Sequence, residues 1–526
     1  MPVDLVGDRS VPDLLRERTE RTPGKQWLVD DDGLGRVRSL TYEDFTQAVA
    51  KLAGGLAKTG VGRGDSVVVH LDNGCEYVVL LFACAWLGAI AVPSNTANTE
   101  RELAHVLRAC DARLVVSSHS YAEMVDRARA DRPVPGALLT PADEPGWLGY
   151  AELAGATAVA PTPVESGAPL EILFTSGTTA SPRGVVLTHA NWLWSGERTA
   201  RGLHMDETDR FLTCLPLFHV NAQSLSMLNA LTANGTLVLG PKYSASRYVP
   251  LLRAHRATHT SLVAMLVRTL LEQPPTDLDR AHEVRRVSYA INVSDAERTR
   301  FEDRFGMRLV NGYGLSETMT EVCVAPVFGP ARWPSVGLPA LGREVRVLTD
   351  EGLDAAPGDL GEILVKGVPG RTIMLGYHDD PEATARTIVD GWLHTGDIGY
   401  RDETGYLYFV DRAKDVIKRA GENISASEVE AVIAEHPDVA AVSVVAVPDP
   451  LRDEAVKACV ILRGNATITA ADIQVHCAER LAPFKVPTIV EFWTSFPMTS
   501  IGKVQKKALA EGHGSVEPQA PAGPTP

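Results

Sequence analysis

The stretch from Phe174 to Val185, FTSGTTASPRGV, brings together small hydroxyl side chains, glycine and one arginine. Glycine lets backbone N–H groups approach an anion closely, and serine and threonine add hydroxyl donors. The apolar run LEILF leads into this stretch and GVVLT continues it, so we expect a strand, a loop and a second strand. The glycine and lysine spacing of a Walker A motif is absent. The stretch therefore predicts a polyphosphate-binding loop of another type.

Two carboxylates and two basic residues stand out farther along the chain. Glu317, in NGYGLSE, offers the hard oxygen ligand that Mg²⁺ prefers when it bridges phosphates. Asp397, in GWLHTGDIGY, could accept both hydroxyl protons of a ribose. His219 in LPLFHV and Lys503 in SIGKVQKK complete the set. Taken singly, these residues also fit ordinary places, such as a histidine in a core or a carboxylate on a solvated surface.

Taken together and in this order, the stretches resemble the signatures of the adenylate-forming superfamily. Its members are acyl- and aryl-CoA synthetases, nonribosomal peptide adenylation domains and beetle luciferases, and the resemblance extends over nearly the whole chain. Three residues depart from the usual pattern: Ala180 replaces a glycine, Arg183 replaces a lysine and Ser316 replaces a threonine. The resemblance implies an enzyme that uses ATP and Mg²⁺ to convert a carboxylic acid to acyl-AMP and then transfers the acyl group to coenzyme A.

The resemblance also assigns roles to the residues at matching positions. Lys503, Glu317 and His219 would be catalytic, and Glu317 would bind Mg²⁺. ATP would be bound by Thr175, Ser176, Gly177, Thr178, Thr179, Arg183, Tyr313, Ser316, Asp397 and Arg412. The hinge and the thioester-forming step would use Lys414, Lys418, Gly421 and Asn423. The acyl pocket would be lined by His219, Asn221, Ala290, Ile291, Gly312 and Gly314.

Four shorter stretches bear on the identity of the acid. KYSASRY, MLVRTLLEQPP, YAINVS and RWPSVG resemble carnitine and crotonobetaine CoA ligases. In those ligases an acidic residue follows the Phe-His pair, whereas this chain has Asn221 in that segment. A quaternary ammonium group favours a carboxylate or an aromatic cage, so we expect a bulky, mostly apolar acid instead. A composition rich in alanine, arginine and proline is typical of actinobacterial proteins and favours an acid from secondary metabolism.

Several other functions stay open on the sequence. The chain could be a carnitine or betaine CoA ligase, or an adenylating enzyme that loads a carrier protein or relies on a partner for thiolation. A luciferase-like oxygenase and a non-catalytic nucleotide-binding protein are further alternatives, although the intact Lys503 and Glu317 disfavour the last. The formal net charge of −15 disfavours nucleic acid or an anionic membrane as a partner.

The elements that must position these residues follow from local patterns. Thr41 and Asp44 have the spacing of a helix start, and Thr99 and Glu102 begin a second helix that ends near Cys110. Apolar runs at residues 66–71 and 113–117 predict buried strands. Alternation of this kind predicts a parallel sheet with helices on both faces.

The chain as a whole is too long, at 526 residues, for one hydrophobic core. We expect an α/β fold with a large N-terminal domain (residues 1–411) of stacked βα-layer subdomains plus a β-rich subdomain from Arg343 to Asp411. A small α+β domain, which the resemblance implies is mobile, would span residues 412–510. A disordered tail would span residues 511–526.

The cysteines and the N-terminus bear on the compartment. The seven cysteines include no CxxC pair, which disfavours a disulfide framework or a zinc site and favours a reducing cytoplasm. The N-terminus lacks the pattern of a signal peptide. The uncharged run from Tyr77 to Pro93 is interrupted by Gly88, so we expect a buried helix and a short strand rather than a membrane span.

Overall fold

The computed structural model describes residues 4–138, 146–175, 182–290, 293–330, 332–412, 416–419, 422–449, 453–464, 466–481, 483–498 and 504–512. The chain forms two compact units. The first comprises residues 1–345, 364–394 and 405–407, and the second comprises residues 346–363, 395–404 and 408–526. The expected boundaries after residues 411 and 510 stay predictions.

The first unit contains an eight-stranded sheet that carries the predicted phosphate loop. Its strand order is β19-β9-β8-β4-β3-β5-β6-β7, parallel from β8 to β7 and antiparallel at β9 and β19. The strands are β3 (Ser66–His70), β4 (Ile90–Pro93), β5 (Leu114–Ser117), β6 (Gly136–Leu138), β7 (Trp147–Gly149), β8 (Pro169–Thr175), β9 (Arg183–Thr188) and β19 (Gly376–Tyr377).

A nine-stranded sheet in the same unit carries three of the six predicted acyl-pocket residues, Ala290, Gly312 and Gly314. Its order is β16-β15-β14-β13-β12-β10-β11-β1-β2, with β14 to β1 parallel. The strands are β1 (Gln26–Asp31), β2 (Val37–Thr41), β10 (Arg210–Thr213), β11 (Thr236–Leu239), β12 (His259–Val263), β13 (Arg286–Ala290), β14 (Arg308–Gly314), β15 (Glu321–Val324) and β16 (Leu338–Pro339).

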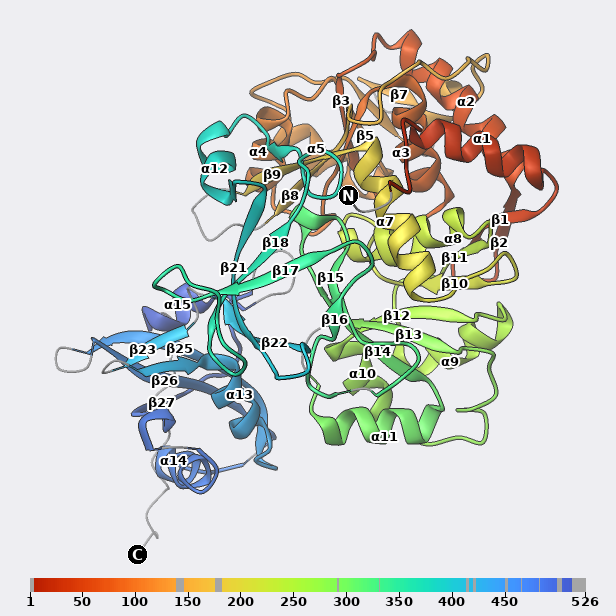
Figure 1. The fold of residues 1–526 in the computed structure, drawn as a ribbon. Coiled ribbons are helices and arrows are strands. Elements are labelled where there is room, and N and C mark those ends of the chain that lie inside the picture. The colour runs from red at the N-terminus through yellow and green to blue at the C-terminus, as the bar shows by residue number, and fades with distance from the viewer. Residues whose placement is uncertain are drawn as a thin grey trace, which may run out of the picture. The chain divides into compact units, whose positions relative to one another are not determined.

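Helices cover both faces of these sheets, as the alternating pattern predicted (Figure 1). They are α1 (Val11–Arg21), α2 (Tyr42–Lys58), α3 (Cys75–Leu87), α4 (Glu100–Ala109), α5 (Ala122–Ala128), α6 (Tyr150–Ala154), α7 (His189–Gly202), α8 (Asn229–Thr232), α9 (Ala245–Ala254), α10 (Ala264–Leu271), α11 (Asp295–Phe305) and α12 (Pro381–Thr387). Short 3₁₀ turns lie at η1 (His119–Tyr121) and η3 (Ser316–Thr318), and η2 (Ala222–Leu228) is a π-helix.

A row of buried aromatic rings joins three of these helices to a strand of the nine-stranded sheet. The ring centroids of Trp27 on β1 and Phe45 on α2 lie 5.9 Å apart, and those of Phe45 and Phe82 on α3 lie 5.3 Å apart. Phe82 in turn lies 5.9 Å from Trp192 on α7. Edge-to-face contacts of this kind add to the free energy gained by burying the rings, so the row fixes the helices against one another.

The local signals at helix ends are confirmed. Thr41 and Asp44 form a reciprocal capping box at the start of α2, and Thr99 and Glu102 form another at the start of α4. The uncharged run at residues 77–93 folds as α3 and β4, separated at Gly88, whose φ is +74°. No helix within the described ranges is long and apolar enough to cross a membrane.

The strand signals between Arg343 and Asp411 form a five-stranded sheet of order β17-β18-β21-β20, with β22 beside β21. These strands are β17 (Glu344–Leu348), β18 (Gly361–Lys366), β20 (Ile388–Val389), β21 (Trp392–Arg401) and β22 (Leu407–Arg412).

The C-terminal part of the second unit is an α+β sandwich. A sheet of order β24-β23-β26-β25, with β27 beside β26, packs α13 and α14 through a core that includes Ile424, Val456 and Ile473. A second cluster places Leu509 of α15 beside Trp493. The elements are β23 (Val416–Arg419), β24 (Glu422–Ser425), α13 (Ala426–Ala434), β25 (Val439–Asp449), β26 (Asp453–Leu462), α14 (Ala470–Ala478), η4 (Pro483–Lys485), β27 (Ile489–Phe492) and α15 (Lys506–Ala510).

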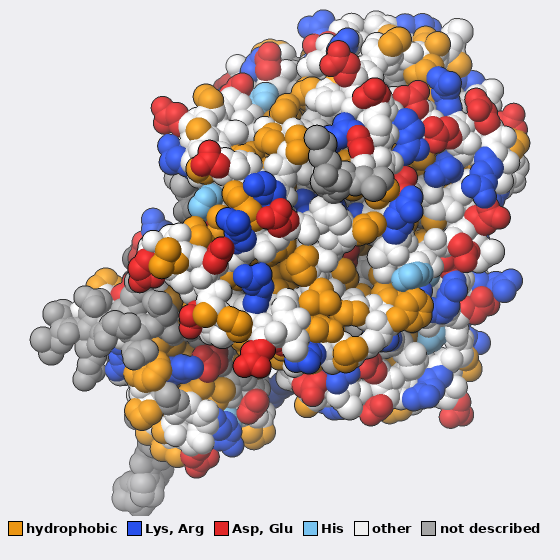
Figure 2. Space-filling model, in the orientation of Figure 1, with side chains coloured by type: hydrophobic (Ala, Val, Ile, Leu, Met, Phe, Trp, Pro, Cys, Tyr) orange, Lys and Arg blue, Asp and Glu red, His pale blue; other side chains and the backbone are white. Residues whose placement is uncertain are grey.

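The charged side chains on the face shown in Figure 2 are mixed. Lys and Arg are interspersed with Asp and Glu rather than gathered in one basic patch. This face therefore lacks the clustered cations that a nucleic-acid surface requires.

A buried carboxyl group on β8 makes stability depend on pH. Glu171 is fully buried, and its burial raises the pKa from 4.5 to about 7. A raised carboxyl pKa favours the folded state fully below about 4.5, and this contribution is lost as pH rises to about 7.

We expect the free energy of unfolding of the wild type, relative to Glu171→Gln, to fall by about 3 kcal/mol between these pH values, because one proton changes stability by about 1.4 kcal/mol per pH unit. Urea unfolding of both proteins across this range measures the difference. A difference that stays constant with pH would contradict the burial of an ionisable Glu171.

Candidate active site

Several of the predicted acyl-pocket and ATP-binding residues lie where parallel strands of the nine-stranded sheet end. Val263 at the end of β12 pairs with Ala290 at the end of β13, and Tyr289 pairs with Asn311 on β14. Ligands of open α/β sheets bind outside the carboxyl ends of the strands. The strand register therefore brings Ala290, Tyr313 and η3 to the edge of the sheet where a ligand is expected.

Close packing against β15 explains why position 314 at this edge of the sheet is a glycine. β15 runs antiparallel to β14, and a Cβ atom on Gly314 would lie 2.7 Å from the carbonyl oxygen of Thr320. A Cβ on Gly312 would lie 3.2 Å from the Glu321 carboxylate. Any side chain at position 314 would therefore push β15 away, whatever the ligand.

The Glu317 carboxylate is held by a residue that sequence reasoning did not single out. The hydroxyl group of Tyr377 on β19 donates to Glu317 Oε1 over 2.8 Å, and Met374 N donates to the Glu317 carbonyl over 2.7 Å. Burial, together with the neighbouring Glu317 carboxylate, raises the pKa of Tyr377 above its usual value. The phenol therefore stays protonated and keeps donating.

The buried guanidinium of Arg343 fixes the turn that carries Glu317. Its Nη2 donates to the carbonyl oxygen of Thr318 over 2.8 Å, and its other nitrogens donate to the carbonyls of Glu321 and Thr372. Arg343 thereby joins η3 to the segment just before Met374. Neither Tyr377 nor Arg343 lies in a motif with a chemical signature of its own, which is why sequence reasoning missed them.

Arg183 lies beside the same tyrosine. Its guanidinium carbon lies 5.4 Å from the centroid of the Tyr377 ring, and its Nε lies 3.7 Å from Asp380 Oδ2. Thr175 and Arg183 pair across β8 and β9, so they form the base of the predicted phosphate loop. A cation and a carboxylate on two sides of one phenol suit a polyphosphate with its divalent ion.

The Phe-His turn follows β10. His219 is exposed, which excludes a place in the core, and its ring centroid lies 4.6 Å from that of Phe218. Asn221 is half-buried, and its Oδ1 accepts a hydrogen bond from the Ser261 hydroxyl of β12 over 2.8 Å. The π-helix η2 begins at the next residue, and π-helical turns are frequent at functional sites.

The predicted residues of the second unit lie on its strands. Asp397 on β21 is buried, and its N–H donates to Thr395 Oγ1 over 3.1 Å. Lys418 on β23 pairs with Asn423 on β24, so the antiparallel register places two predicted thiolation residues opposite each other. The backbone of Arg412 ends β22.

Some predicted residues lie outside the described residues. They are Ser176, Gly177, Thr178, Thr179, Ile291, Lys414, Gly421 and Lys503. The side chains of Arg412, Lys418 and Asn423 are likewise not described.

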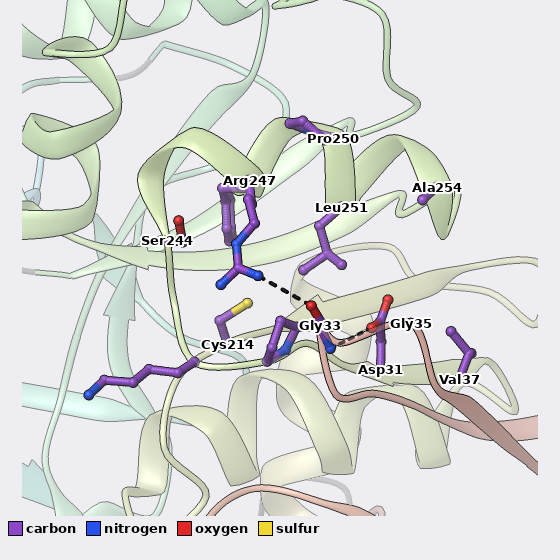
Figure 3. Close-up of a pocket in the computed structure, with 13 residues that line it drawn as sticks. Asp31, Gly33, Gly35, Val37, Cys214, Ser244, Arg247, Pro250, Leu251 and Ala254 are labelled. Atoms are coloured by element: carbon purple, nitrogen blue, oxygen red, sulfur yellow. Dashed lines mark hydrogen bonds between the residues drawn. The ribbon is translucent and has the colours of Figure 1, made fainter.

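A cavity of about 330 Å³ lies elsewhere on the nine-stranded sheet (Figure 3). Cys214 after β10, α9 and the loop between β1 and β2 line it, and Arg247 donates to the carbonyl of Gly33 over 3.3 Å. Its lining includes none of the predicted site residues. The candidate site is therefore distinct from this cavity.

Comparison with known families and curated proteins covers nearly the whole chain. Residues 15–378 match the family model described as AMP-binding enzyme, and residues 428–503 match its C-terminal domain. The chain is 36% identical over 518 residues to a crotonobetaine/carnitine–CoA ligase of Salmonella agona, covering 96% of this chain and 100% of the relative.

Two solved structures show the same fold. O-succinylbenzoate coenzyme A synthetase from Bacillus subtilis in complex with AMP matches at 26% identity and a TM-score of 0.85, covering 97% of this chain and 100% of that one. ATP-bound MatB from Rhodopseudomonas palustris matches at 26% identity and a TM-score of 0.86, covering 95% and 99%. The mixed α/β fold with a large and a smaller domain is thus confirmed.

Tyr377→Phe removes only the hydroxyl group that donates to Glu317. We expect the Mg²⁺ concentration at half-maximal pyrophosphate release to rise by about ten-fold, because a hydrogen bond to a charged group contributes about 1.5 kcal/mol or more. Tyr406→Phe is the matched control, since its hydroxyl donates to the carbonyl of Pro330 over 2.9 Å. Equal Mg²⁺ dependence in the two variants would contradict the role of Tyr377.

Proposed function

The chain belongs to the AMP-binding enzyme family, and we propose that the acid it activates is bulky, mostly apolar and without a permanent positive charge. Like its relatives, the protein is an acid–thiol ligase of the acyl-CoA synthetase type, with ATP and coenzyme A as substrates. The observation that carries the choice of acid is Asn221. Its neutral amide has its oxygen bound to Ser261, so it offers no carboxylate to a cationic substrate.

The first half-reaction needs groups that stabilise negative charge on the phosphates. The acid carboxylate attacks the α-phosphate in line, and pyrophosphate leaves. Arg183 and the loop after Thr175 would hold the β- and γ-phosphates, and Lys503 would hold the acid carboxylate against the α-phosphate. The Glu317 carboxylate, oriented by Tyr377, fits a Mg²⁺ ion, which would neutralise charge on the phosphate oxygens.

The second half-reaction replaces AMP by the thiol of coenzyme A. The acyl-AMP is already a strong electrophile, so no side-chain nucleophile is required. Lys418 and Asn423, whose backbones pair between β23 and β24, would serve this step, with Lys414 as the hinge between the two states. Asp397 would bind the ribose hydroxyls in both.

A second candidate acid is carnitine or crotonobetaine. It is favoured by the 36% identity to ligases of that name over almost the whole chain. The two candidates differ at one testable point, which is whether the pocket accepts a trimethylammonium group. A further alternative is transfer to a carrier protein or by a partner instead of to free coenzyme A.

The decisive assay is pyrophosphate release with a panel of acids, each with and without coenzyme A. We expect bulky apolar acids to be turned over faster than carnitine, and acyl-CoA to appear only when coenzyme A is present. Faster turnover of carnitine would overturn the proposed acid. Acyl-AMP without acyl-CoA would assign thiolation to another protein.

Substitutions of two lysines should separate the half-reactions. Lys503→Ala should lower acid-dependent pyrophosphate release by at least about 100-fold, since its charge acts mainly in the transition state. Lys418→Ala should leave pyrophosphate release near wild type and slow acyl-CoA formation. Single-turnover measurements of both products test this, and equal losses of both steps in both variants would contradict the division.

Asn221→Asp tests the charge preference of the pocket. A carboxylate beside an apolar acid costs several kcal/mol or is held protonated, so kcat/KM for the apolar acid should fall. We expect the ratio of kcat/KM for carnitine to that for the apolar acid to rise by at least about ten-fold. Ser261→Ala, which removes the partner of Asn221 without adding charge, is the control and should leave the ratio unchanged.

A further inference from the structure

The turn that carries Phe218 and His219 is held by side chains through its main chain. Asn73, which follows β3, donates from Nδ2 to the carbonyl oxygen of Leu215 over 2.8 Å and accepts from the N–H of Leu217 over 2.9 Å. Gln223 in η2 donates from Nε2 to the carbonyl oxygen of Leu217 over 2.8 Å. Both backbone groups of Leu217, one residue before Phe218, are therefore bound by side chains.

Gln223 is itself anchored in the core. The same Nε2 atom donates to Glu171 Oε1 over 2.7 Å, and Trp192 Nε1 donates to Glu171 Oε2 over 3.0 Å. All three side chains are fully buried. The N–H of Gln223 also donates to the carbonyl oxygen of His219 over 3.4 Å, so this residue contacts the turn at two points.

The hydrogen bond between Gln223 and Glu171 connects two parts of the candidate site. Glu171 lies on β8, whose last residue is Thr175, where the predicted phosphate loop begins. Asn73 follows β3 of the same eight-stranded sheet, whereas the turn follows β10 of the nine-stranded sheet. Residues on β8 and just after β3 of the eight-stranded sheet thus fix a turn that follows β10 of the nine-stranded sheet.

A contribution to the stability of the fold does not by itself explain this buried hydrogen-bond network. A buried polar network is often no more stabilising than apolar side chains of similar volume, and removing one partner of it is costly. What a network of fixed hydrogen bonds does provide is a defined position for the groups it binds. Here the group bound is the main chain next to the exposed His219.

We propose that Gln223 is a positioning residue for the acid substrate. Through its bonds to Glu171 and Leu217, it holds the Phe218–His219 turn in place relative to β8. This inference rests on the proposed acyl-pocket role of His219. Gln223 contacts no substrate in this proposal, because it is fully buried and acts only through the turn.

Gln223→Met tests the proposal, since methionine has a similar length but donates no hydrogen bond. We expect KM for the acid to rise at least about five-fold, with KM for ATP within about two-fold of wild type, because the loss of such a bond is worth about 1 kcal/mol or more. Trp192→Phe is the matched control. It also removes one hydrogen bond from Glu171 but leaves the bonds to the turn in place, so KM for the acid should stay within about two-fold.

A double-substitution cycle separates positioning from stability. If Gln223 acts through His219, the effects of Gln223→Met and His219→Ala on KM for the acid should be strongly non-additive. Additive effects, an unchanged KM in Gln223→Met, or equal changes in Gln223→Met and Trp192→Phe would each overturn the proposal.

A second variant covers the case in which Gln223→Met does not fold. Asn73→Asp keeps the acceptor for Leu217 N–H and loses the donor to Leu215, and it should raise KM for the acid in the same way. A wild-type KM for the acid in this variant would also overturn the proposal. All comparisons use the acid that the wild type adenylates best, so failure of the proposed acid class appears in the wild type and failure of the positioning role appears only in the variants.

Discussion

The buried carboxyl group of Glu171 accepts hydrogen bonds from Trp192 and Gln223 in an interior where a polar group without partners would cost about 1–3 kcal/mol. Meeting that requirement constrains much of the first unit. Trp192 on α7 must face β8, and α7 is in turn held by the row of aromatic rings that reaches β1. Gln223 must face the same carboxylate from η2, which places the turn after β10. One buried group on β8 is therefore linked through Gln223 to the turn after β10.

Glu317, a proposed catalytic residue, illustrates the same principle. Its position depends on contacts with residues far along the chain, namely the Tyr377 hydroxyl, the N–H of Met374 and, through the turn, the Arg343 guanidinium. Electrostatic catalysis depends on groups that are oriented before the reaction begins. The segment from Thr372 to Tyr377 does this for Glu317 and places Tyr377 beside Arg183 as well.

The parts of the fold that could be predicted from sequence are those encoded locally. The capping boxes at Thr41 and Thr99, the break at Gly88 and the alternation of strands and helices all follow from neighbouring residues. The site residues came from a resemblance in motifs. Tyr377, Arg343 and Glu171 could not be found in this way, because their roles arise from hydrogen bonds that join positions 21 to 60 residues apart in the sequence. Periodicity and composition carry no information about such pairs.

The way the turn after β10 is held has a consequence for how the protein could change its acid over evolutionary time. Asn73 and Gln223 bind main-chain atoms, which every amino acid except proline presents alike. These hydrogen bonds do not involve the side chains at positions 218 and 219. On the proposed pocket role of His219, a descendant sequence could therefore exchange these two side chains, and with them the shape and polarity offered to the acid, while the turn keeps its course. On that proposal, selectivity and scaffold are encoded at separate positions, so one can change while the other is kept.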